Sequence, residues 1–321
     1  MLNQAQLRQF DQEGYLVVND ILNDLELQSI IREYTALLDK LCEDWLREGL
    51  IEETYADLPF EARLVELFQK GCDYAAHMDI CLPLDGIEAD TPIHLGEAIF
   101  DLITNPKLLS CVESLIGPEI YSNPIQHVRI KPPAKYLPEH KVSATLRKTN
   151  WHQDQAVALP EADETKVITV WLAISDATVE NGCLAVIPKS HREDLTLHCT
   201  GKVNRDAIYI PDVLIDKENI TPVPVRRGGA LFMTSRTQHS SLENNSEQFR
   251  WSFDLRYNPV GQATGRDMFP GFVAKSAAQP EQVLRDPEVW ADLWLETRER
   301  LAQQDETSFN RWGELASELC A

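Results

Sequence analysis

Two histidines and one carboxylate stand out as residues that could hold a metal ion: His152, Asp154 and His239. On a strand, residues two apart point to the same side, so the imidazole of His152 and the carboxylate of Asp154 could share one ion. The same pattern at His77 and Asp79 lies in a helical stretch, where residues two apart diverge by about 200°. A His-x-Asp pair alone is therefore a weak signal, and its alternative is a hydrogen-bonded surface pair.

The second histidine strengthens the metal hypothesis. Residues 228–233 read as a turn into a buried strand, which delivers His239 shortly afterwards. Two histidines and one carboxylate on one face of an octahedral ion leave three positions open, as in non-haem Fe(II) enzymes that activate oxygen. Imidazole and carboxylate are also harder ligands than thiolate, which favours Fe(II) over a zinc or iron–sulfur site. The pattern therefore predicts an iron site.

Arg250 adds a second binding function in the expected strand at residues 249–257. The two-residue period divides this strand into a polar and an apolar face. The polar face holds Arg250, Ser252, Asp254 and Arg256, and the opposite face holds Trp251, Phe253, Leu255 and Tyr257. A planar guanidinium binds a carboxylate in bidentate fashion, which a lysine cannot do. Alone, Arg250 could equally form a salt bridge at the rim.

The elements that would position these residues change character along the chain. Asn23 with Glu26 predicts a helix start, and helical spacing continues to about residue 117. Short segments rich in Val, Ile, Trp and Tyr then follow at residues 120–130, 167–174, 183–187, 230–234 and 249–257. Turn residues rather than helices separate them, which predicts an antiparallel sandwich or barrel. Helical spacing returns after Gly271.

Composition limits the function classes. The 321 residues contain 30 Lys and Arg against 51 Asp and Glu, a net charge of −21. Such an acidic surface repels nucleic acid and anionic lipid, so we expect neither as a partner. No apolar stretch reaches the length of a membrane span, and the N-terminus lacks a secretion pattern. Seven cysteines without a Cys-x-x-Cys pair predict scattered free thiols in a reducing cytoplasm rather than disulfides.

Taken together, the motifs carry a family resemblance over about residues 10–260. The sequence resembles the phytanoyl-CoA dioxygenase family of Fe(II)- and 2-oxoglutarate-dependent oxygenases. The matching segments, in the family's order, are Ile130-Lys131-Pro132-Pro133, Trp151-His152-Gln153-Asp154, Val170-Trp171-Leu172-Ala173, Glu180-Asn181-Gly182-Cys183-Leu184, Ile187-Pro188-Lys189-Ser190-His191, and His239 with Arg250 beyond it. Each segment alone is unspecific, whereas the combination is specific.

The resemblance implies a mainly β core with flanking helices, a double-stranded β-helix (a cupin-like jelly roll). It implies a single domain over residues 1–321: N-terminal helices at 1–117, the jelly roll at 118–260 and C-terminal helices at 261–321. By similarity, His152, Asp154 and His239 bind Fe(II), and Arg250 binds the distal carboxylate of 2-oxoglutarate. Four further residues match positions that contact or flank this cosubstrate or complete an Arg-x-Ser pair: Lys131, Trp171, Ser241 and Ser252.

The implied function is a dioxygenase that uses Fe(II), 2-oxoglutarate and O₂ to oxidise a small organic substrate, releasing succinate and CO₂. Asp154 stands where related halogenases have Gly or Ala, which favours hydroxylation or another oxidation over halogenation. Lys189 replaces the glycine of the family's Pro-Gly-Ser-His, so the shape of this turn is open. His191 is expected to be structural, and the role of His127 is open. The N-terminal helices and segments 133–148 and 196–224 are candidates for a lid and pocket wall.

Two rival functions remain at this point. A cupin-like metalloenzyme without a cosubstrate would use the three metal ligands but would leave Arg250 and Ser252 without a role. A catalytically silent barrel that only binds a ligand has no use for a costly group of buried polar residues. Iron and 2-oxoglutarate binding distinguishes the three hypotheses.

Overall fold

The structure, a computed structural model, describes residues 1–137, 146–200, 208–304, 311–312 and 318–320. Its strands form three sheets, and all the strand pairs are antiparallel. The six-stranded sheet has the order β1 (Tyr15–Val18), β8 (Ala230–Thr234), β3 (Ile168–Ala173), β10 (Arg250–Pro259), β2 (Ile120–Lys131) and β11 (Phe272–Lys275). The smaller sheets are β7 (Thr221–Val223), β4 (Leu184–Val186) and β9 (His239–Ser241), and β5 (Cys199–Thr200) with β6 (Ile208–Tyr209).

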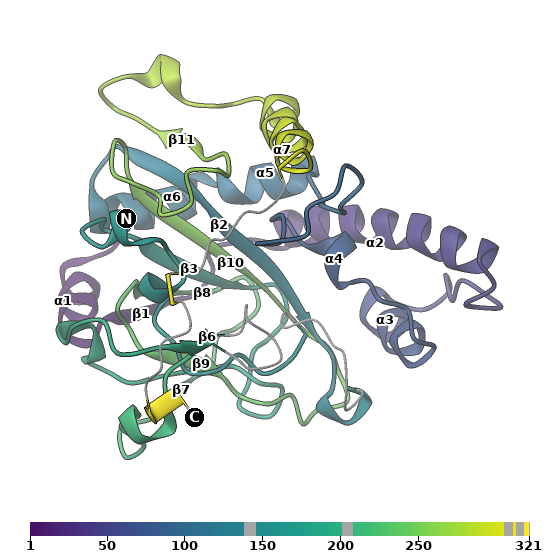
Figure 1. The fold of residues 1–321 in the computed structure, drawn as a ribbon, viewed down its shortest axis with the longest axis horizontal. Coiled ribbons are helices and arrows are strands. Elements are labelled where there is room, and N and C mark those ends of the chain that lie inside the picture. The colour runs from purple at the N-terminus through teal and green to yellow at the C-terminus, as the bar shows by residue number, and fades with distance from the viewer. Residues whose placement is uncertain (138–145, 201–207, 305–310, 313–317, 321) are drawn as a thin grey trace.

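Seven α-helices are present in the described residues, and six of them precede β2. They are α1 (Gln4–Glu13), α2 (Asp24–Arg47), α3 (Phe60–Gln69), α4 (Ala75–Met78), α5 (Glu97–Ile103), α6 (Pro106–Ile116) and α7 (Pro287–Leu301). The predicted start of α2 is confirmed, because Asn23 and Glu26 form a reciprocal capping box. In Figure 1, α5 and α6 lie near the upper end of the large sheet, below β11, and α7 lies at the upper right. Helices α2 to α4 lie to the right, and the small sheet with β7 and β9 lies below.

The large sheet is apolar on the face that the helices cover. Trp251, Phe253, Leu255 and Tyr257 of β10 are almost fully buried in the same core cluster as residues of α2, α3, α5, α6 and α7. Tyr34 of α2, for example, packs edge-on against Trp251 with ring centres 5.0 Å apart. The predicted division of β10 into two faces is therefore correct.

A second core fills the space between the large and the small sheet. It contains Trp171 and Leu231 from the large sheet and Leu184, Val186 and Val223 from the small one. Two facing antiparallel sheets with helices on the outside form the predicted double-stranded β-helix. The polar face of β10 points into this inner space, where the candidate site lies.

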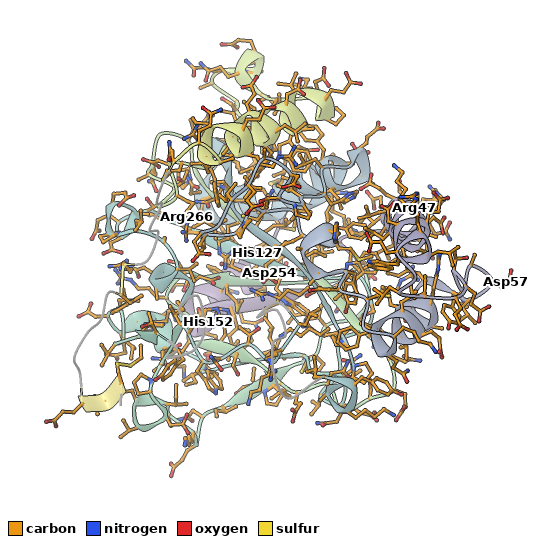
Figure 2. All side chains as sticks on the ribbon, turned by 45° about the vertical axis from the view of Figure 1, so that its right-hand side comes forward. Arg47, Asp57, His127, His152, Asp254 and Arg266 are labelled. Carbon is orange, nitrogen blue, oxygen red and sulfur yellow. A yellow bond between two sulfur atoms is a disulfide. The ribbon has the colours of Figure 1, made fainter. Side chains whose placement is uncertain are left out.

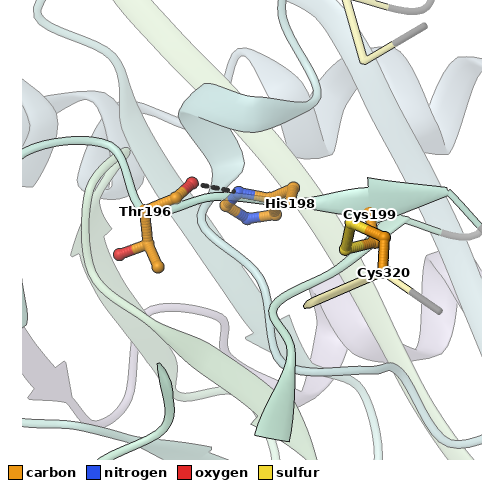
Figure 3. Close-up of a disulfide and its surroundings, with 4 residues drawn as sticks. All are labelled: Thr196, His198, Cys199 and Cys320. Carbon is orange, nitrogen blue, oxygen red and sulfur yellow. Dashed lines mark hydrogen bonds between the residues drawn. A yellow bond between two sulfur atoms is a disulfide. The ribbon is translucent and has the colours of Figure 1, made fainter. Parts of the chain in front are cut away.

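One sequence-based prediction is wrong: the cysteines are not all free. Cys199 on β5 and Cys320 near the C-terminus form a disulfide, with their Cα atoms 5.4 Å apart (Figure 3). The two cysteines are separated by 121 positions, so no local spacing could indicate the pair. The other five cysteines are free and buried.

The helices of the described residues include none that is both long and apolar enough to cross a bilayer. Only part of the predicted lid at 133–148 lies within the described residues. Its start forms a short 3-10 turn at Ala134–Tyr136, and residues 138–145 lie outside the described residues. Likewise, residues 201–207 of the predicted pocket wall at 196–224 lie outside them.

Candidate active site

The fold brings His152, Asp154 and His239 together between the two sheets. His239 begins β9, and His152 pairs with it through an isolated bridge in which each backbone N–H donates to the other's carbonyl at 2.9 Å. The Nε2 atoms of His152 and His239 lie 3.6 and 3.9 Å from Oδ1 of Asp154. All three ligand atoms lie within 4.8 Å of one another, so they could hold one metal ion.

The local structure differs from the predicted strand. Asp154 begins a 3-10 turn, Asp154–Ala156, instead of continuing an extended segment from His152. The two side chains converge nevertheless, because Gln153 between them is extended and the chain turns only at Asp154. His77 and Asp79 form no such group: His77 lies on α4, and Asp79 binds Nδ1 of His127 at 2.9 Å.

Both histidines are oriented to bind a metal through Nε2. Nδ1 of His152 donates to the carbonyl of Asn150 at 2.8 Å, and Nδ1 of His239 donates to the carbonyl of Thr237 at 2.9 Å. A proton fixed on Nδ1 leaves the lone pair of Nε2 free, which is the usual arrangement around a metal-binding imidazole. Burial lowers the pKa of His239 to about 4, so this ring is neutral near pH 7.

Asp154 is held in its charged form by two neighbours. Nη2 of Arg256 donates to its Oδ1 at 2.6 Å, and the hydroxyl of Thr169 donates to its Oδ2. Burial opposes the charge, but Arg256 and the two histidines together lower the pKa of Asp154 well below its usual value. The carboxylate is therefore both ionised and fixed in orientation before any metal binds.

Arg250 lies in the same pocket with much of its guanidinium unsatisfied. It is fully buried, its Nη1 donates to Ser252 at 3.1 Å, and its Nε and Nη2 have no hydrogen-bond partner. Its guanidinium lies 5.0 Å from the ring centre of Trp171, whose Nε1 also lacks a partner. Burial lowers the pKa of Arg250 to about 10. These unpaired donors fit a carboxylate-bearing ligand, because buried donors are costly without an acceptor.

The other predicted cosubstrate residues flank this end of the pocket. Lys131 lies opposite Arg250 in the β2–β10 pairing, and its Nζ donates to Ser241 at 2.8 Å and to Thr149 at 2.9 Å. Burial, with the nearby Arg250 and Arg129, lowers the pKa of Lys131 well below its usual value. Lys131 and Ser241 therefore satisfy each other, and Ser252 positions the guanidinium of Arg250.

Sequence reasoning missed a charged pair, Arg129 with Asp254, in the same pocket as Arg250. Nε of Arg129 on β2 donates to Oδ2 of Asp254 at 2.5 Å, while the buried Oδ1 of Asp254 has no partner. Both residues line the pocket with the three candidate metal ligands. Figure 2 shows Asp254, His127 and His152 gathered near the centre of the molecule. Strand parity had placed Asp254 and Arg256 on this face, but nothing in the sequence identified their partners.

His191 contacts the first helix and not the metal pocket. Its Nε2 lies 3.1 Å from the carbonyl of Asp11, at the end of α1, which agrees with the structural role expected for it. Lys189, which replaces the family's glycine, has a φ of 68°. The turn therefore keeps the left-handed backbone that glycine favours, at some cost in strain.

Comparison with known proteins assigns the chain to a family. Residues 10–252 match the family described as "Phytanoyl-CoA dioxygenase (PhyH)". The chain belongs to this family. Iron and 2-oxoglutarate are the family's cofactors, and both the triad and the unpaired guanidinium across the pocket fit them.

Two curated relatives span most of the chain at low identity, and a third matches a shorter part at higher identity. A protein of Danio rerio described as "Phytanoyl-CoA dioxygenase domain-containing protein 1" is 24% identical over 271 residues, 78% of this chain and 88% of that protein. "Ectoine dioxygenase" of Nocardia farcinica is 22% identical over 275 residues, 81% of this chain and 78% of that protein. "Methylphosphonate hydroxylase" of Gimesia maris is 33% identical over 113 residues, only 35% of this chain and 41% of that protein.

Solved structures of similar fold support the architecture. The non-heme monooxygenase ThoJ in its apo form has a TM-score of 0.56 at 16% identity, over 94% of this chain and 100% of that chain. EvdO2 from Micromonospora carbonacea var. aurantiaca, complexed with 2-oxoglutarate, has a TM-score of 0.50 at 18% identity, over 82% of this chain and 94% of that chain. At these identities the likeness concerns the fold.

Proposed function

We propose that this phytanoyl-CoA dioxygenase family member hydroxylates a small organic substrate, converting 2-oxoglutarate to succinate and CO₂. The observation that carries the proposal is the combination in one pocket of a His-Asp-His triad and a buried, partly unpaired Arg250. Bound iron and 2-oxoglutarate would supply the oxidation of a C–H bond by O₂. The protein would supply positions, charges and exclusion of water.

Each protein group has a distinct task in this proposal. His152, Asp154 and His239 would hold Fe(II), and Arg250 would bind the far carboxylate of 2-oxoglutarate. Nε1 of Trp171, which is buried without a partner, is available as a further donor at this end. Because Asp154 is charged and already oriented, it requires little rearrangement when the metal binds.

The substrate would meet a mixed surface beside the metal. Leu184 and Met233 are apolar, whereas Arg129 and Asp254 are charged and leave one buried carboxylate oxygen without a donor. A small molecule with a hydroxyl or amine group fits this side better than a wholly apolar chain. Relatives named after ectoine and methylphosphonate are consistent with a small polar substrate. The net charge of −21 argues against a nucleic-acid partner.

The alternative hypothesis, a cupin-like metalloenzyme that uses no cosubstrate, leaves the unpaired Nε and Nη2 atoms of Arg250 unexplained. Anaerobic addition of Fe(II) and then 2-oxoglutarate separates the possibilities. Our proposal expects a weak visible metal-to-ligand charge-transfer band that needs both components. Iron binding without this band would favour the cosubstrate-independent enzyme, and no iron uptake would favour the silent barrel.

A substitution at Arg250 sharpens the test. Arg250→Ala should raise the 2-oxoglutarate concentration needed for the band by at least about 10-fold, because a bidentate ion pair is lost. Iron affinity measured without 2-oxoglutarate should change little. Arg47→Ala, which removes an exposed helix pair with Asp44, is the matched control and should change neither. Equal loss of iron and cosubstrate binding in Arg250→Ala would contradict the assigned role.

A further inference from the structure

The C-terminal residues Arg311 and Trp312 lie on the back of the turn that carries the metal ligands. Arg311 forms a two-pronged ion pair with Asp163, with N···O distances of 2.6 and 2.8 Å. Its Nη1 also lies 3.3 Å from the carbonyl of Gln155 and 3.4 Å from that of Ala158. One guanidinium thus connects both ends of the segment that follows Asp154.

Trp312 holds the same segment at a second point. Its indole N–H donates to the carbonyl of Ala156 at 2.9 Å. Its ring packs on His198, with centres 5.1 Å apart. Nε2 of His198 in turn accepts the backbone N–H of Gln153 at 3.0 Å. Gln153 separates the two ligands His152 and Asp154, so this chain of contacts ends at the ligands themselves.

The disulfide fixes the C-terminus to this position. Cys199 directly follows His198 and is bonded to Cys320, eight residues beyond Trp312 (Figure 3). Nδ1 of His198 donates to the carbonyl of Thr196 at 2.7 Å, as the same figure shows. The link restricts the distance that Trp312 can move away, which raises its effective concentration at the ligand turn. The family match ends at residue 252, well before these C-terminal residues.

We propose that Arg311 and Trp312 are positioning residues for the metal site and that the Cys199–Cys320 disulfide locks them in place. Reduction of the disulfide would release the C-terminal contacts and loosen the turn at residues 153–158, which weakens metal binding. Redox conditions would thereby control the occupancy of the site. This inference rests on the proposed metal-binding role of His152 and Asp154.

The release step is a two-electron reduction. With a phosphine reductant and water, the S–S bond breaks, the two cysteines become thiols, and the phosphine becomes its oxide. The five other cysteines are already free and buried, so they do not take part. A protein disulfide in a reducing compartment commonly has such a redox-sensing role.

The test compares oxidised protein with protein reduced by a phosphine and then desalted without oxygen. Peptide mass spectrometry of the oxidised protein should contain the bridged Cys199–Cys320 peptide. In the metal-free protein, reduction should raise amide exchange of residues 153–158 by about 10-fold, with no change in β10. Affinity for Co(II), followed by its visible absorption, should fall by about 10-fold, the range typical of lost support around metal ligands.

Variants separate positioning from general stability. Trp312→Phe keeps an aromatic ring but loses the N–H that donates to the carbonyl of Ala156. Arg311→Lys keeps the positive charge but cannot form the two-pronged ion pair with Asp163. With the disulfide intact, both variants should show part of the effect of reduction, that is, faster amide exchange at 153–158 and weaker Co(II) binding. Arg311→Ala and Trp312→Ala should show the full effect. The double variant Cys199→Ser, Cys320→Ser should behave like reduced protein and should not respond to the phosphine. Arg47→Ala serves as the control.

Three results would overturn the inference. They are the absence of the bridged peptide, equal exchange at 153–158 in oxidised and reduced protein, or an increase in exchange that is as large in β10 as in the ligand turn. Failure of the oxidised wild-type protein to bind Co(II) would instead contradict the proposed function. The exchange measurement needs no metal, so it tests the role of the C-terminal residues in either case.

Discussion

The two faces of the large sheet use the same strands for opposite purposes. On β10, the outward residues Trp251, Phe253, Leu255 and Tyr257 pack against helices, whereas the inward residues Arg250, Ser252, Asp254 and Arg256 form the site. Both faces are buried. The outer face is stabilised by apolar burial, and the inner face depends on ion pairs and hydrogen bonds that satisfy its charges.

The inner face contains buried polar groups that lower the stability of the folded protein and that a bound ligand could satisfy. Arg256 and Asp154 neutralise each other, and so do Arg129 and Asp254. Arg250, in contrast, has two unpaired nitrogens at a depth where unpaired donors are unfavourable. Five unsatisfied buried atoms, on Trp171, Arg250, Asp254 and Arg256, lie at the pocket, where a ligand could complete them. On the helix-covered face, the indole nitrogens of Trp251 and Trp294 also lack a partner, but no charged group is left unpaired on β10 there.

The largest expected effect is on the inner face. Asp154→Asn should abolish 2-oxoglutarate turnover, because the amide is a poorer metal ligand and leaves Arg256 without its ion pair. Succinate release and iron content of the purified protein measure the loss. The thermal transition should remain cooperative. Turnover within a factor of ten of wild type would show that Asp154 is not a ligand.

The matching change on the outer face should act on stability instead. Phe253→Ala removes a fully buried ring beside Tyr34, with ring centres 6.0 Å apart, and should cost about 3–5 kcal/mol of unfolding free energy. Chemical denaturation measures this cost. Iron affinity per folded molecule should be unchanged. A large fall in that affinity would mean that the two faces are not independent.

Neighbouring residues of β3 allow a closer comparison. Thr169 donates to Asp154 from the inner face, and Val170 is buried in the outer core. Thr169→Val should weaken iron binding by about 10-fold, because a ligand loses its supporting donor. Val170→Thr should cost about 1–3 kcal/mol of stability through a buried hydroxyl, with iron affinity unchanged. Competition with a chromogenic chelator measures iron affinity, and denaturant melts measure stability. The comparison would be contradicted if Thr169→Val mainly lowered stability and Val170→Thr mainly lowered iron affinity.

A further expected effect is a pH dependence of stability that arises on the site side. Burial lowers the pKa of His198 from its ordinary value of 6.5 to about 4. Between these values the unfolded chain binds more protons, so the contribution of His198 is complete above pH 6.5 and is lost as the pH falls towards 4. The loss amounts to at most about 3 kcal/mol. His198→Gln should flatten this part of the stability curve of the metal-free protein; an unchanged slope would contradict the prediction.

The outer face should add nothing to that acid slope. Its buried ionisable groups include Tyr257, and burial raises the pKa of this phenol well above its usual value. Such a group stays neutral in the folded protein at acidic pH, so it affects stability only in strongly alkaline solution.

Local patterns predicted those features that depend on neighbours in sequence. The capping box at Asn23 was predicted because its partner is three residues away. Strand parity predicted which β10 side chains share a face. The extended geometry assumed for His152 and Asp154 was wrong in detail, because Asp154 begins a turn supported by residues far along the chain. Their convergence was predicted correctly.

The types of the candidate metal ligands, the alternating faces of the strands and the family could all be predicted from the order of residues. The pairing of the buried charges could be found only in the folded protein. Arg256 contacts Asp154 across 102 positions, and Cys199 reaches Cys320 across 121. Such pairs are set by strand order and by the path of the chain around the core. No period of two or 3.6 residues encodes these contacts, because the energy that selects them comes from packing the whole domain.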